Sequence, residues 1–141
     1  MYTFRRASDD IAELARQLGV SNIILGGHDC YTPIRLLAKT LPNFAYMEHL
    51  ASGELEEHIQ SKSELRAFLN GCFGFPRGPN GEVGFTPEHG MQFENLLKLG
   101  ATALFTSREL DYYAGEYARN GIRGPDNWYR IRDLNFSTEY E

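Results

Sequence analysis

The chain has 141 residues, enough for one domain with a modest core, and its 42% hydrophobic and 13% aromatic content indicates a packed globule rather than a disordered chain. The formal net charge of −5 and the lack of any block of basic residues argue against nucleic acid and anionic membranes as partners. No apolar run is long enough to span a membrane, and Met1 is not followed by the apolar segment of a secretory signal, so we expect a cytoplasmic protein.

Residues 9–18 are predicted to form the first helix. Their apolar side chains recur at helical spacing: Ile11, Leu14, Ala15 and Leu18. Ser8 or Asp9 can cap the start of this helix, and Gly19 allows it to end. Residues 20–25 are rich in β-branched side chains and precede two glycines, which predicts a short buried strand. A helix, a tight turn and a buried strand form half of an α/β unit.

Four further helices are predicted downstream. They are expected at residues 53–60, 62–71 and 107–120, and in a short segment that begins at Pro125. Two of these helices begin with a capping box, in which a hydroxyl side chain is followed three positions later by glutamate: Ser61 with Glu64, and Thr106 with Glu109. The helix at residues 62–71 also has an apolar stripe that indicates a core face: Leu65, Phe68, Leu69 and Cys72.

The remaining segments are predicted to be less regular. Residues 71–84 are rich in glycine and proline and indicate an exposed loop. Residues 85–88 predict a capping residue and a proline at the first position of a brief helix. Residues 95–103 are expected to form an irregular surface connection. The acidic segment 131–141 is expected to fray.

The segment from Gly121 to Arg130 holds the only tryptophan and combines two glycines, a proline, two arginines and a tyrosine. Gly121 suits the end of one helix, and Pro125 suits the first position of the next. Trp128 is predicted to anchor the segment by apolar burial, which leaves Tyr129 free to aim its hydroxyl elsewhere. The segment resembles the sequence G-F-R-G-P-x-N-W-Y-R of soluble and fungal epoxide hydrolases, in the α/β-hydrolase superfamily. In that family it ends a helical cap domain, and its tyrosine donates a hydrogen bond to the epoxide oxygen.

Two other stretches carry the same resemblance. The letters G-H-D that end at Asp29 resemble the family's nucleophile turn, in which the aspartate attacks the epoxide carbon. Tyr46 matches the second tyrosine that holds the epoxide oxygen. The resemblance breaks directly after Asp29, because Tyr31 stands where the turn needs glycine and Pro33 resists the helix that should follow. We therefore expect an internal deletion at this point. Within the C-terminal motif, Asp126 occupies a variable position.

The resemblance implies a fragment of an α/β-hydrolase. The expected architecture is a mostly α-helical cap domain preceded by a helix–strand remnant of the main sheet. Residues 1–33 would be the remnant of the main domain, and residues 34–130 would be the helical cap, or lid. Residues 131–141 would begin the return to the main domain.

The resemblance also implies a reaction. A small apolar epoxide would be hydrolysed to a vicinal diol through an aspartyl ester, without a cofactor. Asp29 would be the nucleophile, and Tyr46 and Tyr129 would donate hydrogen bonds to the epoxide oxygen. Phe44 and Trp128 would contact the substrate.

Several parts of the family's reaction have no counterpart in the chain. The loop that holds the oxyanion is missing, as are the acid and the histidine base that activate water. Four histidines are present, but His28 belongs to the nucleophile turn and the other three fall in cap positions. Neither the histidines nor the two cysteines, Cys30 and Cys72, have the spacing of a metal site or of a disulfide framework. The isolated chain is therefore expected to be an incomplete catalyst.

Two alternatives to an epoxide hydrolase remain open. The first is a non-catalytic cap module that binds an apolar ligand or associates with itself through exposed apolar surface. The second is a non-functional truncated product, in which the strand at residues 20–25 has no neighbour to pair with. Turnover of an epoxide would separate the enzyme from the binding module, and a soluble chain that melts cooperatively would count against the non-functional product.

Overall fold

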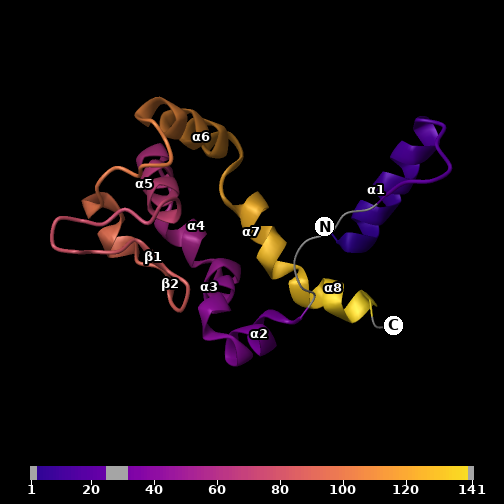
Figure 1. Ribbon diagram of the computed structural model, residues 1–141, viewed down its shortest axis with the longest axis horizontal. Helices are drawn as coiled ribbons and strands as arrows, with labels where there is room; N and C mark the ends of the chain where they lie inside the picture. The colour runs from indigo at the N-terminus through magenta and orange to yellow at the C-terminus, as the bar shows by residue number, and fades with distance from the viewer. Residues whose placement is uncertain (1–2, 25–31, 140–141) are drawn as a thin grey trace.

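The computed structural model describes residues 3–24 and 32–139, and most of them are helical (Figure 1). Within these ranges η1 and η2 are short 3-10 helices, and none of the α-helices is both long and apolar enough to cross a membrane. In chain order the elements are α1 (Phe4–Gln17), α2 (Ile34–Thr40), η1 (Pro42–Phe44), α3 (Tyr46–Ser52), α4 (Glu54–His58), α5 (Lys62–Cys72), β1 (Phe85–Thr86), β2 (Gly90–Met91), η2 (Phe93–Lys98), α6 (Ser107–Asn120), α7 (Arg123–Arg130) and α8 (Arg132–Glu139).

The main core lies where α5 and α6 pack side by side (Figure 1). Both helices begin with the predicted capping boxes: the Ser61 hydroxyl accepts from the backbone N–H of Glu64, and the Thr106 hydroxyl accepts from that of Glu109. Both also span the residues predicted for them, α5 with one more residue at its end. The buried core side chains are Leu50, Leu55, Ile59, Leu65, Phe68, Leu69, Met91, Leu96, Leu110, Ala114 and Ile122.

A short hairpin replaces the brief helix predicted at residues 85–88. Strands β1 and β2 pair antiparallel, with Phe85 opposite Met91 and Thr86 opposite Gly90. The helix prediction is wrong because the chain reverses between the strands: the Thr86 hydroxyl accepts from the backbone N–H of His89 at 3.2 Å, and Gly90 has a φ of 74°. The loop predicted at residues 71–84 is confirmed, apart from its first two residues, which end α5.

Helices α2 and α3 occupy residues 34–52, where the sequence predicts no helix. Each has 7 residues, too few for apolar periodicity to be recognised. Tertiary packing stabilises them instead, because Ile34 and Leu37 of α2 form a second buried cluster with Met47 of α3. Helix α3 also packs against α7, the helix that carries the C-terminal motif (Figure 1).

Residues 132–139 form α8, so the prediction that the C-terminal segment frays is wrong for them. Two polar side chains of α8 are buried and hold it in place. The Asn135 Oδ1 accepts from the backbone N–H of Phe4 at 3.0 Å, and the Arg132 Nε donates to the carbonyl of Thr32 at 3.2 Å. The acidic composition of residues 131–141 does not predict these contacts, because both join segments that are distant in sequence.

Helix α1 begins at Phe4, five residues before the predicted start, because the Thr3 hydroxyl caps it by accepting from the backbone N–H of Arg6. None of the residues of α1 is buried. The strand predicted at residues 20–25 is not formed by residues 20–24, and Leu25 lies outside the described residues. Ile24 is fully exposed. Within the described ranges the sheet consists of β1 and β2, so this segment has no strand beside it to pair with.

Candidate functional site

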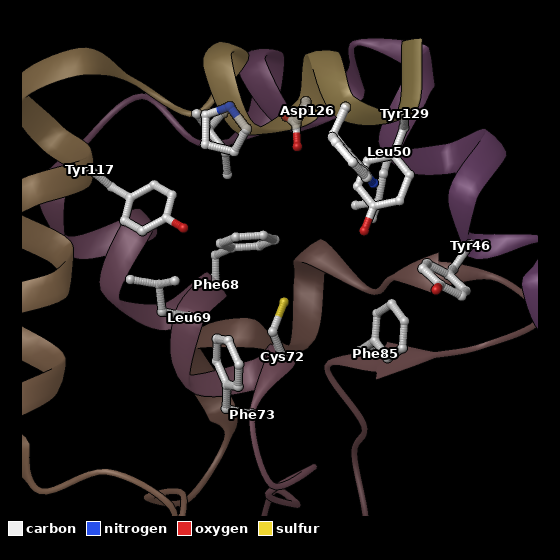
Figure 2. A pocket seen from close by; sticks show the side chains of 13 residues that line it. Tyr46, Leu50, Phe68, Leu69, Cys72, Phe73, Phe85, Tyr117, Asp126 and Tyr129 are labelled. Atoms are coloured by element: carbon white, nitrogen blue, oxygen red, sulfur yellow. The ribbon is translucent and has the colours of Figure 1, made fainter. Parts of the chain in front are cut away.

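An apolar pocket of about 360 Å³ lies between α3, α5, α6, α7 and β1 (Figure 2). Its walls are mainly aromatic and aliphatic side chains, with a few polar groups placed among them, which is the usual make-up of a small-molecule site. The residues that line it are Tyr46, Leu50, Phe68, Leu69, Cys72, Phe73, Phe85, Tyr117, Ile122, Pro125, Asp126, Trp128 and Tyr129.

The pocket brings together the two tyrosines that the sequence singles out. Tyr46 is the first residue of α3, and Tyr129 lies near the end of α7. Their rings meet edge to face, with centroids 6.4 Å apart and an interplanar angle of 76°. In Figure 2 the Tyr129 hydroxyl points into the pocket, and Tyr46 lies beside it. The pairing is produced by the packing of α7 on α3.

The position of Tyr46 is fixed by contacts on both sides. Its backbone N–H donates to the carbonyl of Pro87 at 2.9 Å, in the turn between β1 and β2. Its ring meets Phe85 edge to face at 5.4 Å and stacks on Phe44 at 6.5 Å. Phe44, predicted to contact the substrate, therefore supports Tyr46 from behind and is not among the residues that line the pocket.

The position of Tyr129 depends on how α7 is held. The neighbouring residue Arg130 forms a partly buried ion pair with Glu56 of α4, with Nη2 2.6 Å from the carboxylate. The Arg130 Nε also donates to the carbonyl of Ala51 at 3.3 Å, at the end of α3. This side chain therefore joins α3, α4 and α7, and so holds the helix that carries Tyr129.

Asp126 is the acidic residue of the pocket, and the sequence gives it no role. Its side chain is only 4% exposed, and its Oδ2 atom is buried without a hydrogen-bond partner in the part of the chain that the structure describes. Burial and, to a smaller extent, the nearby Glu56 carboxylate raise the pKa of Asp126, the Arg130 guanidinium opposes them, and together they bring it to about 6. The one sequence signal is the spacing, since an acid three residues before Tyr129 shares its helix face.

Cys72 lines the pocket, and its thiol is expected to be unreactive. Burial and the Asp126 carboxylate raise the pKa of its thiol to about 12, and the Sγ atom donates to the sulfur of Met91 at 3.7 Å. The prediction that Cys72 belongs to the core is confirmed by its packing against the main buried cluster.

Trp128 does not anchor the motif by burial, and that prediction is wrong. Its side chain is 57% exposed, and its ring meets Phe4 of α1 edge to face at 6.0 Å. The physical reason is helical geometry: Asp126 and Tyr129 share the face of α7 that packs inward, so the residue between them points outward. Trp128 still lines the pocket.

The remaining predicted groups lie elsewhere. Asp29 and His28 fall outside the described residues. The other three histidines do not line the pocket: the His49 Nδ1 lies 2.9 Å from the carbonyl of His89, and His58 stacks on Phe93. Within residues 3–24 and 32–139, no group of three histidine, cysteine or acidic side chains could hold a metal ion.

The sequence of the chain is similar to those of two proteins named epoxide hydrolases. The chain is 40% identical over 101 residues to a protein named epoxide hydrolase srdG from Neurospora crassa, a match that covers 70% of this chain and 30% of that protein. It is 38% identical over 61 residues to epoxide hydrolase A from Mycobacterium tuberculosis, covering 43% of this chain and 16% of that protein. The matches thus span less than a third of either relative's length. No family model matches the chain.

Proposed function

We propose that this epoxide hydrolase-like chain binds a small apolar epoxide in the pocket and holds the epoxide oxygen between Tyr46 and Tyr129. The observation that carries the proposal is the meeting of these two tyrosines, from helices far apart in the sequence, at the wall of an apolar pocket. The similarity to proteins named epoxide hydrolases supports the same reading.

The chemistry explains why two tyrosines suit this role. When a carboxylate attacks an epoxide carbon, the carbon–oxygen bond of the ring breaks and negative charge develops on the oxygen. Neutral hydroxyl groups donate hydrogen bonds to that oxygen, and one of them supplies its proton. Such hydrogen bonds are stronger among apolar side chains than in water, and the pocket wall is mostly apolar.

Asp29 is the proposed nucleophile. Its attack would leave the substrate bound to the enzyme as an ester, with the former epoxide oxygen now a hydroxyl group. Release of the diol requires water to attack the ester, and a base normally activates that water. No histidine of the described ranges lines the pocket, so we propose that the ester forms and persists.

The domain division forms part of the proposal. Residues 34–130 would act as the helical cap, residues 1–33 as a remnant of a main domain, and residues 131–141 as the start of the return to it. The main core and the smaller cluster around Met47 support this division, because their buried residues all lie between Ile34 and Ile122.

Self-association is the second candidate function, and one observation favours it. Three apolar side chains, two in α1 and one at its C-cap, are exposed at helical spacing: Ile11 at 40%, Leu14 at 54% and Leu18 at 67%. A contiguous apolar helix face of this kind is often covered by another chain. Sedimentation equilibrium of the full chain and of a Leu14→Glu variant measures this, and a concentration-independent monomer mass would refute it.

Intact-mass spectrometry after incubation with a reactive terminal epoxide tests the main proposal. We expect one covalent adduct, mapped to Asp29 by peptide analysis, which persists for hours. Tyr46→Phe and Tyr129→Phe should each slow its formation by about a hundredfold, the usual effect of removing one donor to a developing oxyanion. Tyr112→Phe is the matched control, because Tyr112 is 64% exposed on α6 and lies outside the pocket. Labelling of cysteine alone, or equal labelling of Asp29 in all four proteins, would refute the proposal.

A further inference from the structure

We infer that Asp126 makes the pocket selective for epoxides that carry a hydroxyl group on an otherwise apolar body. This inference rests on the proposed function of Tyr46 and Tyr129 and names the class of substrate that their pocket favours. The residue is not one of the groups that the epoxide-opening step requires, so it would act on which epoxide binds.

The first observation is the direction of the Asp126 side chain. In Figure 2 its carboxyl group points from α7 into the pocket, towards Phe68. It is 4% exposed, and nothing in the described part of the chain donates a hydrogen bond to its buried Oδ2 atom. Buried polar atoms normally have a partner, so an unpaired acceptor on a side chain that lines a ligand-sized cavity indicates that the ligand supplies the donor.

The second observation is the charge around this carboxylate. The neighbouring cation, Arg130, is engaged by Glu56 and by the carbonyl of Ala51. The other ionisable side chains that line the pocket come from α3, α5, α6 and α7, and none is of a kind that carries a positive charge: Tyr46, Cys72, Tyr117 and Tyr129. Within the described chain, therefore, no cationic side chain donates a hydrogen bond to the Oδ2 atom of Asp126.

The spacing along α7 defines the ligand further. Asp126 and Tyr129 are three residues apart, so their side chains project from one helix face roughly 5–6 Å apart at the Cβ atoms. One ligand can therefore place its epoxide oxygen at Tyr129 and a hydroxyl group at Asp126. Between the two, its carbon chain would contact aliphatic and aromatic walls such as Leu50 and Phe68.

A hydroxyl group fits this site better than an ammonium group. Transfer of a charged group into an apolar pocket loses much more hydration than transfer of a neutral hydroxyl. A hydrogen bond between a neutral donor and a carboxylate still gives a preference of about tenfold to a hundredfold over a ligand without the donor. A ligand without a donor would also leave the buried oxygen unsatisfied.

The test measures binding of three epoxides to the full chain by the change in fluorescence of Trp128, the only tryptophan, which lines the pocket. The probes are an eight-carbon terminal epoxide, the same epoxide with a hydroxyl group at its far end, and the methyl ether of that alcohol. All proteins carry Asp29→Asn so that no ester forms during the titration. We expect the alcohol to bind at least tenfold more tightly than the ether, and Asp126→Leu to abolish this preference.

The outcomes separate this inference from the proposed function. Equal affinity for alcohol and ether, with binding that still weakens in Tyr129→Phe, would refute selectivity at Asp126 and leave the proposed function standing. No saturable binding of any probe would refute both. Asp126→Leu must bind the unsubstituted epoxide at least as tightly as the parent, because leucine adds apolar wall. Loss of all binding with a retained cooperative melt would overturn the inference. Asp111→Asn, an exposed acid of α6, is the control and should keep the preference.

Discussion

Replacing Asp126 by asparagine is expected to stabilise the chain at pH 8 and to change its stability little at pH 4. The pKa of Asp126 rises from an ordinary 3.8 to about 6 on folding. The folded state therefore holds this proton more tightly than the unfolded state does. Stability from this residue is present at low pH and is lost as the pH rises from about 4 through 6. Asparagine keeps the shape of the side chain and removes its charge.

The magnitude follows from the pKa change. At about 1.36 kcal/mol per pKa unit, the ionised carboxylate destabilises the fold by about 3 kcal/mol at most. The pocket admits solvent, which screens the charge, so we expect roughly half of that value, about 1.5 kcal/mol. The amide of asparagine is also buried, but its energetic cost does not change with pH and cancels when the two pH values are compared.

Urea denaturation of both proteins at pH 4 and pH 8 measures this difference. On going from pH 4 to pH 8, the parent should lose about 1.5 kcal/mol more of its free energy of unfolding than Asp126→Asn does. Asp9→Asn is the matched control, since Asp9 is exposed on α1, and its effect should differ by less than about 0.5 kcal/mol between them. If the change in the free energy of unfolding between pH 4 and pH 8 were the same for Asp126→Asn and Asp9→Asn, Asp126 would be solvated and the reasoning would be refuted.

Two further predictions concern the core. Leu55→Ala should cost about 3 kcal/mol in chemical denaturation because Leu55 is fully buried, whereas Leu97→Ala should cost less than about 0.5 kcal/mol because Leu97 is 77% exposed; similar costs would contradict the core described above. In a Cys30→Ser background, Cys72 should react with a disulfide reagent at pH 8 about a thousandfold more slowly than a free thiol, because its pKa near 12 leaves little thiolate. Fast labelling of the folded chain would mean that the thiol is open to solvent.

The parts of the fold that the sequence predicts well are those set by local rules. The capping boxes at Ser61 and Thr106 satisfy backbone N–H groups within one helical turn, so their geometry needs no distant partner. The stripe that includes Leu65 and Phe68 repeats at helical spacing and faces the core as predicted. Helices with both signals, α5 and α6, have close to the predicted bounds.

The errors lie where distant segments decide the outcome. Residues 20–24 have the composition of a buried strand, but a strand needs a neighbour to pair with, and composition does not reveal whether one exists. Helix α8 is acidic, yet Asn135 and Arg132 join it to Phe4 and Thr32, which are 131 and 100 residues away in the sequence. Local composition carries no information about contacts of this kind.

The candidate site was open to prediction only in part, for the same reason. The resemblance to epoxide hydrolases identifies Tyr46 and Tyr129, whereas only the spacing from Tyr129 points to Asp126, because a charged residue in a turn-rich motif is normally expected to be exposed. Its burial depends on which face of α7 packs against α3, and that is decided by contacts between distant segments, such as the one between Arg130 and the Ala51 carbonyl of α3. A buried acid whose pKa is raised and whose Oδ2 atom has no hydrogen-bond partner in the described chain is an energetic exception within the fold. A ligand donor would remove that exception, and this links the pH dependence of stability to the choice of substrate.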